Sequence, residues 1–299
     1  MSVDVNTSPM SDSGLTDHLP NRPGDFDRRP LPVAVFLVVA AIVPVVVYWV
    51  VRPVLRDGLG LDLAQNWPRI AGTVVGGTLV LLLGVGMLRW EGVSLERIGG
   101  SRRHALWGIG WFLGIVAALN ALLFVVALTV ADSYEITVGG LAPLDWVGFA
   151  VVNWVFVGLA EELIARGYLQ NKLIALLGGG TRIRRRVAGV VLAALLFAAW
   201  HLPQRLVVAE VPLDRLPVNL LQLALVAVGV GLVYELTRNL VLVALVHGAW
   251  NFPPIFLSVY GTRTWQGVVL LLAIVVPFVV GIVLYWRLAV GQAGPRVPS

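Results

Sequence analysis

Residues 32–51 read PVAVFLVVAAIVPVVVYWVV, a run of twenty residues without a single charge. An α-helix of this length is about 30 Å long at about 1.5 Å per residue, which is the thickness of the hydrocarbon core of a bilayer. The apolar core of a cleavable signal peptide is shorter and begins nearer to the N-terminus. The run therefore predicts a retained membrane span.

The composition extends this prediction to most of the chain. Hydrophobic residues make up 58% and charged residues 13%, whereas an ordinary soluble domain has about 25% charged residues. Further apolar segments cover residues 70–88, 105–131, 146–165, 187–202, 216–236, 240–256 and 268–286. Backbone groups in hydrocarbon must bond within the protein, and the alternation typical of a β-barrel is absent. We predict an all-α fold, a polytopic integral membrane helical bundle of about eight transmembrane helices.

The organisation along the chain follows from the same segments. Residues 1–31 are rich in Ser, Asp, Asn and Pro, which predicts a disordered cytoplasmic tail. Three N-terminal transmembrane helices occupy 32–145, a transmembrane core that holds the polar motifs occupies 146–257, and the last helix with a short cytoplasmic tail occupies 258–299.

The basic residues predict how the bundle is oriented. With the N-terminus in the cytoplasm, fifteen of the 22 Lys and Arg residues fall on the cytoplasmic side, six fall on the other side, and Arg166 lies within a span. The positive-inside rule therefore predicts a multi-pass plasma-membrane protein with both termini in the cytoplasm. The net charge of +5 is spread over loops, so no nucleic-acid partner is predicted. We interpret the basic loop 178–186 as a topology determinant rather than a specific headgroup site.

The absence of cysteine limits the available chemistry. It excludes disulfides, zinc-thiolate sites, iron–sulfur clusters and thiol nucleophiles, which leaves Glu, Asp, His and Ser. An ionisable side chain in the middle of a span costs at least about 2.5–3.5 kcal/mol, so its presence needs an explanation.

Apart from Glu235 at one end of the span 216–236, residues of this kind occur in three of the predicted spans. They are Glu161, Glu162 and Arg166 in LAEELIARGY, His201 in FAAWH, and His247 and Asn251 in HGAWN. Helical positions four apart share one face, so Glu162 and Arg166 can pair, whereas Glu161 is turned by about 100° from its neighbour. The two carboxylates therefore need not share a role.

Taken singly, these residues have ordinary interpretations. A Glu–Arg pair near the end of a span is commonly a solvated pair, and an intramembrane His is often a hydrogen-bond partner between helices. Taken together, they supply what peptide hydrolysis requires. A carboxylate can act as a base for water, and imidazole and amide N–H groups can donate to an oxyanion.

The three motifs also carry a family resemblance. E-E-x-x-x-R at 161–166, F-x-x-x-H at 197–201 and H-x-x-x-N at 247–251 follow one another on successive apolar segments, and a Gly-rich span precedes the last. In this order they resemble the CAAX protease and bacteriocin-processing family (CPBP, Abi-type) of intramembrane glutamic endopeptidases. The similarity covers about residues 154–252.

The resemblance implies roles for the motif residues. Glu161 and His201 would activate a water, while His247 and Asn251 would stabilise the oxyanion. Supporting roles would fall to Glu162, Arg166 and Phe197. The expected activity is hydrolysis of a peptide bond near the cytoplasmic leaflet, in a protein or peptide that is prenylated or otherwise membrane-associated. No cofactor and no metal are expected, and the core at 146–257 would be the catalytic part.

Other functions use the same atoms. Glu161, His201 and His247 could form a two-histidine, one-carboxylate zinc site with a water in the open position, although the H-E-x-x-H pattern is absent. The buried acids and imidazoles could instead form the proton relay of a transporter. A catalytically inactive membrane scaffold is a third alternative.

The abundance of Arg, Gly, Val and Ala indicates a bacterial source with a high-GC genome.

Helix arithmetic sets a condition on the catalytic interpretation. Glu161 lies about 22 Å from the outer end of its span, and His201 lies about 22 Å from the cytoplasmic end of the next. The two depths therefore differ by about 10 Å or more across a core of about 30 Å. The fifth helix is therefore expected to start in the cytoplasm, or the helices to tilt around a water-filled cavity. The side chains of Glu161, His201 and His247 should then converge.

Overall fold

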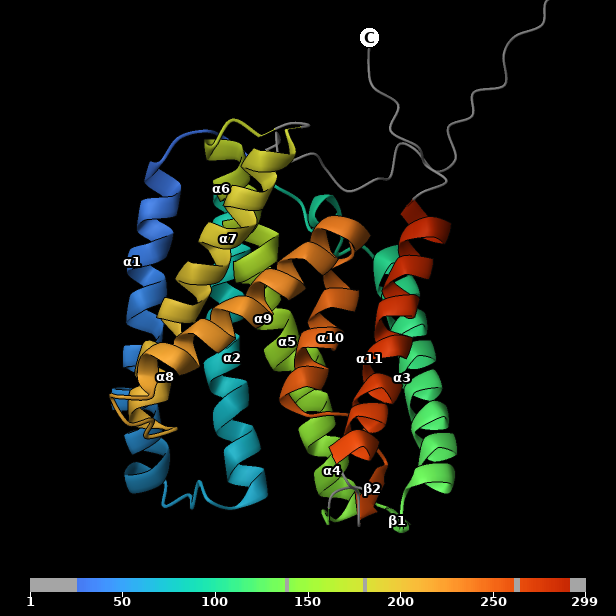
Figure 1. Ribbon diagram of the computed structural model, residues 1–299. Coiled ribbons are helices and arrows are strands. Elements are labelled where there is room, and N and C mark those ends of the chain that lie inside the picture. Colours follow the sequence, from blue (N-terminus) through green and yellow to red (C-terminus); the bar gives the residue numbers. More distant parts are fainter. Residues whose placement is uncertain (1–25, 138–139, 180–181, 261–263, 291–299) are drawn as a thin grey trace, which may run out of the picture.

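The computed structural model describes residues 26–137, 140–179, 182–260 and 264–290, which form a bundle of roughly parallel and antiparallel helices (Figure 1). Within this part of the chain, seven helices are long and apolar enough to cross a membrane. The predicted polytopic helical bundle is confirmed, and the protein is an integral membrane protein. The predicted tail lies almost wholly outside the described residues.

The helices follow one another along the chain in this order. The first long segment is α1 Leu31–Val46 with the π-helical turns Val47–Val51 and Val54–Gly58, and it is followed by α2 Asn66–Trp90, a 3₁₀ turn Glu96–Ile98 and α3 Arg102–Val130. The fourth long segment joins α4 Pro143–Ala150, Val151–Val157, α5 Gly158–Glu162, Leu163–Gln170 and α6 Asn171–Leu176. Then come α7 Ile183–Trp200, α8 Leu202–Val207, α9 Leu216–Thr237, the shorter α10 Leu240–Asn251, and α11 Thr264–Tyr285 with Trp286–Val290.

The helices begin at residues suited to starting them. Proline occupies one of the first two positions of α1, α4, α8 and α9, where no backbone N–H is needed. The side chain of Ser101 accepts a hydrogen bond from His104 N at the start of α3, and Asn239 accepts one from Leu242 N at 2.9 Å at the start of α10. These caps satisfy amide groups that have no partner inside the helix.

The seventh predicted span differs from the structure. In place of a helix over 240–256, α10 has twelve residues and is about 18 Å long, too short for a core of about 30 Å. The chain then runs extended into β2 Leu257–Tyr260, which pairs antiparallel with β1 Ser133–Ile136 in the predicted loop 132–145. The crossing is thus completed by non-helical backbone.

Asn120 on α3 explains how that backbone is tolerated. Its side-chain amide donates to Pro254 O at 2.8 Å, and its Oδ1 accepts from Phe256 N at 2.9 Å. Pro253 and Pro254 have no N–H of their own to satisfy. The polar groups released at the end of α10 therefore find partners inside the protein, as they must at membrane depth.

The fourth predicted span is also longer than expected. Helical turns continue from Pro143 to Leu176 because the polar residues after 165 are enclosed by the bundle rather than placed at an interface. Arg166, Gln170, Asn171 and Lys172 are all at most 4% exposed. Glu161 therefore lies near the middle of a long helical segment and not near its end.

The observed helix bounds reduce the calculated depth difference between Glu161 and His201. Glu161 precedes Leu176 by 15 residues, or about 22 Å, and His201 follows Ile183 by 18 residues, or about 27 Å. Both distances are measured from the same end of the bundle. The remaining difference of about 5 Å is within the reach of two long side chains.

The two ends of the bundle differ in charge. At one end, uppermost in Figure 1, α1 and α7 begin and α2, α9 and α11 finish; we call it the arginine-rich end. The other, the hairpin end, holds the β1–β2 pair and the starts of α2 and α4. Among described residues, the arginine-rich end has thirteen basic residues: Arg28, Arg29, Arg89, Arg97, Arg102, Arg103, Lys172, Arg182, Arg184, Arg185, Arg186, Arg238 and Arg287. The hairpin end has five: Arg52, Arg56, Arg69, Arg205 and Arg215.

Candidate active site

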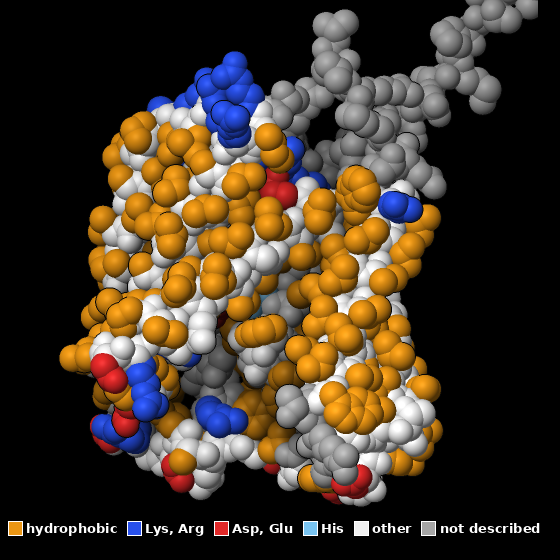
Figure 2. Space-filling model, viewed as in Figure 1, with side chains coloured by type: hydrophobic (Ala, Val, Ile, Leu, Met, Phe, Trp, Pro, Cys, Tyr) orange, Lys and Arg blue, Asp and Glu red, His pale blue; other side chains and the backbone are white. Residues whose placement is uncertain are grey.

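A cavity of about 840 Å³ lies between the helices, lined by parts of α1, α2, α5, α7, α8, α9 and α10. Figure 2 shows the surface hollowed in the lower half of the face it presents, with basic side chains beside the hollow. Six residues singled out by their sequence motifs line this cavity: Glu161, Arg166, Phe197, His201, His247 and Asn251. A polar, water-accessible space is the setting in which ionisable groups are tolerated at membrane depth.

Glu161 occupies the centre of this group. Its Oε2 lies 3.6 Å from Nε2 of His201 and 3.6 Å from Nε2 of His247, so three separate helical segments contribute to one cluster. A separation of 3.6 Å is longer than a direct hydrogen bond and leaves room for a water to bridge the groups. The structure therefore brings together the three side chains that the motifs predict to converge.

The other nitrogen of His201 determines which tautomer faces the cavity. Nδ1 lies 2.9 Å from the carbonyl oxygen of Phe197, which can only accept, so Nδ1 donates its proton there. In the neutral ring, Nε2 then carries a lone pair directed toward Glu161. The ring is held by Phe197, with centroids 4.5 Å apart, and by the edge of Trp200 at 5.1 Å.

His247 is held from the opposite side by Glu162. Its Nδ1 lies 2.5 Å from Glu162 Oε1, and the same oxygen accepts from Nη1 of Arg166 at 2.9 Å. Arg166 also donates to the carbonyl of Ala227 on α9 at 2.6 Å. Glu162 is fully buried and does not line the cavity, so it acts on the site through His247.

Phe197 contacts both imidazoles. Its ring stands edge-on to His247 with centroids 5.9 Å apart, and the guanidinium of Arg166 lies 5.2 Å from its centroid. The phenyl group therefore fills the space between the residues that orient the two histidines. The sequence alone predicts packing only beneath His201.

Two glycines set the distance between the helices that carry Glu161 and His247. A side-chain carbon added to Gly158 would collide with the carbonyl of Ala244, and one added to Gly248 would collide with the backbone of Asn153 and Trp154. The α5 and α10 backbones are therefore in direct contact. Only glycine allows an approach this close at these two positions.

Asn251 lies one turn after His247, at the last residue of α10, where it is exposed to the cavity. Because α10 ends at Asn251, its side-chain amide lines the cavity and is not buried between two packed helices. Its position is compatible with donating to a group bound in the cavity.

Sequence reasoning misses three arginines of this site. Arg52, Arg69 and Arg205 also line the cavity, although the sequence predicts each of them only as a topology signal. Arg69 stacks over Phe149 with its guanidinium 4.4 Å from the ring centroid, and Nε of Arg205 is buried without a hydrogen-bond partner. Their positions near the ends of apolar segments give no sign that they face one cavity.

The donor atoms of the site bear on the zinc alternative. Within the described part of the chain, no group of three or more His, Asp or Glu side chains has the arrangement of a metal site. Metal-independent catalysis stays a prediction.

Comparison with known proteins gives one match. No curated protein and no solved structure matches the chain. Residues 143–253, which contain all three motifs, match the family model described as Rce1-like, type II CAAX prenyl endopeptidase Rce1-like, so the resemblance to the CAAX protease and bacteriocin-processing family is confirmed over this segment.

Proposed function

We propose that the protein is an intramembrane endopeptidase in which Glu161 is the catalytic base. The observation that carries the proposal is that Glu161 Oε2 lies 3.6 Å from Nε2 of both His201 and His247 inside one cavity. The match of residues 143–253 supports intramembrane protease activity in general.

The nucleophile in this proposal is a water bound between Glu161 and His201. With Nδ1–H of His201 donating to Phe197, both Nε2 and the Glu161 carboxylate are acceptors, and one water has two protons to give them. As the water oxygen attacks the peptide carbonyl, Glu161 takes one proton. When the C–N bond breaks, this proton passes to the leaving amine.

The oxyanion in this proposal is stabilised by His247 and Asn251. Nδ1–H of His247 donates to an ionised Glu162, so Nε2 can donate to the oxyanion only when the ring carries both protons. The carboxylates of Glu161 and Glu162 flank the ring, one beside each nitrogen, so both nitrogens have an acceptor nearby. The amide of Asn251 supplies a neutral donor, and the enclosed cavity makes both donors more effective than they would be in water.

Catalysis in this proposal is metal-independent. The carboxylate, two imidazoles and amide supply the base and the donors, so no step requires a Lewis acid. We further propose that the arginine-rich end, with both chain termini, faces the cytoplasm, because thirteen described basic residues lie there against five at the hairpin end.

The proposed activity can be tested before a substrate has been identified. Membrane peptides are compared between cells with the native protein, with Glu161→Gln and with Glu96→Gln, a matched control at an exposed carboxylate of the arginine-rich end. Uncleaved precursors should accumulate with Glu161→Gln alone. Identical peptide profiles in all three strains would contradict proteolysis at this site.

A proton relay is the second candidate, because Glu161, His247, Glu162 and Arg166 form an unbroken series of contacts. It predicts proton flux in liposomes that Glu161→Gln abolishes. Flux through the native protein, together with unchanged peptide profiles, would favour the relay over the protease.

A further inference from the structure

The lining of the cavity is concentrated toward one end of the bundle. On the first long helix it uses the part after Val43, including Tyr48 and Arg52, and on α2 it uses residues from Arg69 to Val80. In Figure 1 these parts of α1 and α2 lie toward the hairpin end. The cavity therefore extends from Glu161 to that end.

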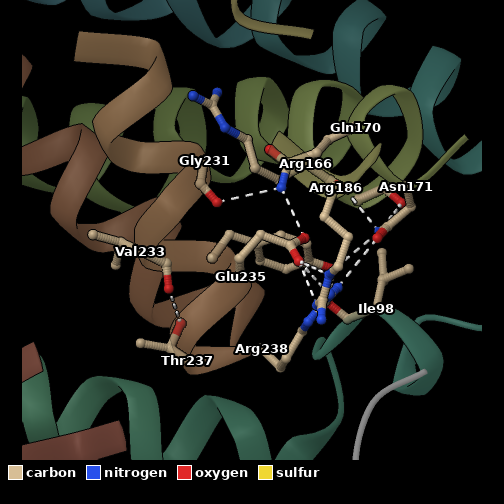
Figure 3. A network of polar contacts seen from close by, with 12 residues as sticks. Ile98, Arg166, Gln170, Asn171, Arg186, Gly231, Val233, Glu235, Thr237 and Arg238 are labelled. Atoms are coloured by element: carbon tan, nitrogen blue, oxygen red, sulfur yellow. Dashed lines mark hydrogen bonds and ion pairs between the residues drawn. The ribbon is translucent and has the colours of Figure 1, made fainter. Parts of the chain in front are cut away.

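The opposite direction is closed by a polar network, drawn in Figure 3. Glu235 on α9 accepts from Gln170 at 3.0 Å, and it forms ion pairs with Arg186 of α7 at 2.5 Å and Arg238 at 2.6 Å. Three segments from different parts of the sequence are thus joined at the arginine-rich end.

A second layer of hydrogen bonds lies beside this network. Asn171 donates to the Tyr234 hydroxyl at 3.0 Å, and that hydroxyl donates to the Ile98 carbonyl at 3.1 Å. Lys172 pairs with Glu91 at 2.6 Å, and both side chains are at most 1% exposed. Gln170, Asn171 and Tyr234 are at most 4% exposed, so packed side chains fill the space between the cavity and the arginine-rich end.

The difference in charge between the two ends indicates which side of the membrane the cavity faces. The arginine-rich end has more than twice as many described basic residues as the hairpin end, which is the asymmetry expected when the arginine-rich end is cytoplasmic. A cavity that reaches the hairpin end and is closed at the other end then communicates with the extracytoplasmic side.

The side chains that line the cavity carry more positive than negative charge. Arg52, Arg69 and Arg205 come from three elements, and no carboxylate pairs with any of them in the part of the chain that the structure describes. Among the described residues, Glu161 is the one acidic side chain in the lining. An excess of unpaired cations in a low-dielectric cleft attracts anions.

We propose that the cavity opens to the extracytoplasmic side and that Arg52, Arg69 and Arg205, which pair with no carboxylate among the described residues, bind a carboxylate of the peptide segment that enters it. The identity of the ligand as a peptide rests on the proposed protease function, whereas the direction of opening and the anion preference do not. This side differs from the cytoplasmic leaflet expected from the sequence, where a fourth span that ends at residue 165 would place the site.

Cysteine labelling tests the direction of opening directly, because the native chain has no cysteine. Thr73→Cys places a thiol in the cavity lining one turn after Arg69. Leu213→Cys and Ile183→Cys are matched controls at exposed positions of the hairpin end and the arginine-rich end, 75% and 69% exposed. Each variant is treated with a membrane-impermeant maleimide in intact spheroplasts and again after permeabilisation.

The expected result is labelling of Thr73→Cys and Leu213→Cys in intact spheroplasts, and of Ile183→Cys only after permeabilisation. Labelling of Thr73→Cys only after permeabilisation would overturn the proposed direction of opening. Labelling of Ile183→Cys in intact spheroplasts would overturn the orientation. Repeating the series in the Glu161→Gln background separates this result from the protease proposal, since labelling requires no catalysis.

Charged thiol reagents test the anion preference in purified protein held in neutral detergent. A sulfonate-bearing methanethiosulfonate should modify Thr73→Cys about tenfold faster than its trimethylammonium counterpart, relative to the same ratio at Leu213→Cys. Replacing Arg52, Arg69 and Arg205 by Gln should bring the relative ratio close to one, while the elution volume and labelling of Leu213→Cys remain unchanged. A ratio close to one with the arginines intact would overturn the anion site.

The phosphate groups of lipids are anions that the same arginines could bind. A second experiment therefore distinguishes a lipid headgroup from a peptide carboxylate. The measurement is repeated in mixed micelles containing phosphatidylglycerol. A preserved preference for the anionic reagent supports a site reserved for the substrate carboxylate. Loss of the preference would assign the arginines to lipid headgroups and overturn the proposal.

Discussion

Nδ1 of His247 lies 2.5 Å from Oε1 of Glu162, a carboxylate with no exposure to solvent or cavity. The catalytic cluster is thus supported by a second acid adjacent in sequence to Glu161 but on the other side of the imidazole. Two neighbouring glutamates can take these positions because successive helical residues are turned by about 100°.

Replacing Glu162 by Gln should lower kcat about 10²-fold or more and change KM little. The amide keeps the shape of the side chain but no longer fixes the protonated His247 ring. Breaking the buried pair with Arg166 should also destabilise the fold by about 3–5 kcal/mol. Steady-state kinetics on a substrate identified from the peptide comparison provides the measurement. A rise in KM alone would contradict the orienting role.

Glu161 should be sensitive to side-chain length as well as to charge. Glu161→Asp keeps the carboxylate but withdraws it by about one methylene from the two Nε2 atoms, and a displacement of about 1 Å can cost about 10²-fold in rate. Glu161→Gln removes the base and should have the larger effect. Single-turnover rates for the two variants provide the comparison. Equal activity of Glu161→Gln and the native protein would exclude general-base catalysis by this residue.

Gly248→Ala should separate the two helices that carry Glu161 and His247. The added methyl group would collide with the backbone at Asn153 and Trp154, and overpacking of this kind costs about 1–3 kcal/mol. Gly110→Ala on α3 is the matched control, since a methyl group there meets no atom within 4 Å. Thermal unfolding in detergent should show a lower Tm for Gly248→Ala alone. Equal Tm values would contradict the direct backbone contact.

Chelators should leave the activity of the protein intact, because the proposed mechanism uses only protein groups and water. The purified protein is treated with 1,10-phenanthroline, its zinc content is measured, and cleavage is then assayed. Stoichiometric zinc that survives in the active protein, or activity restored only by added zinc, would favour the two-histidine, one-carboxylate metal site.

The apolar spans and the motif residues can be predicted because both signals are local. A run without charges specifies a membrane helix wherever it packs, and an acid or imidazole inside such a run is conspicuous against the hydrophobic background. Glu161, His201 and His247 stand out in this way whatever the distances between them.

The helix ends cannot be predicted in the same way because they depend on residues distant in sequence. Arg166 continues the fourth helix as a buried residue because Ala227, on another helix, accepts its hydrogen bond. The chain leaves α10 early because Asn120, 134 positions before Pro254, bonds the freed backbone. The cavity-lining arginines are a similar case, since convergence on one space is a property of the tertiary fold.

The contact from Arg166 to the Ala227 carbonyl couples the position of α9 to that of Glu162, which Arg166 also contacts. Ala227 belongs to α9, which forms one wall of the cavity. An outward swing of this wall, wide enough to admit a bulky chain, would pull Arg166 away from Glu162 and release the ring of His247. The proposed mechanism therefore requires α9 in the position that the structure shows, where Arg166, Glu162 and His247 stay in contact.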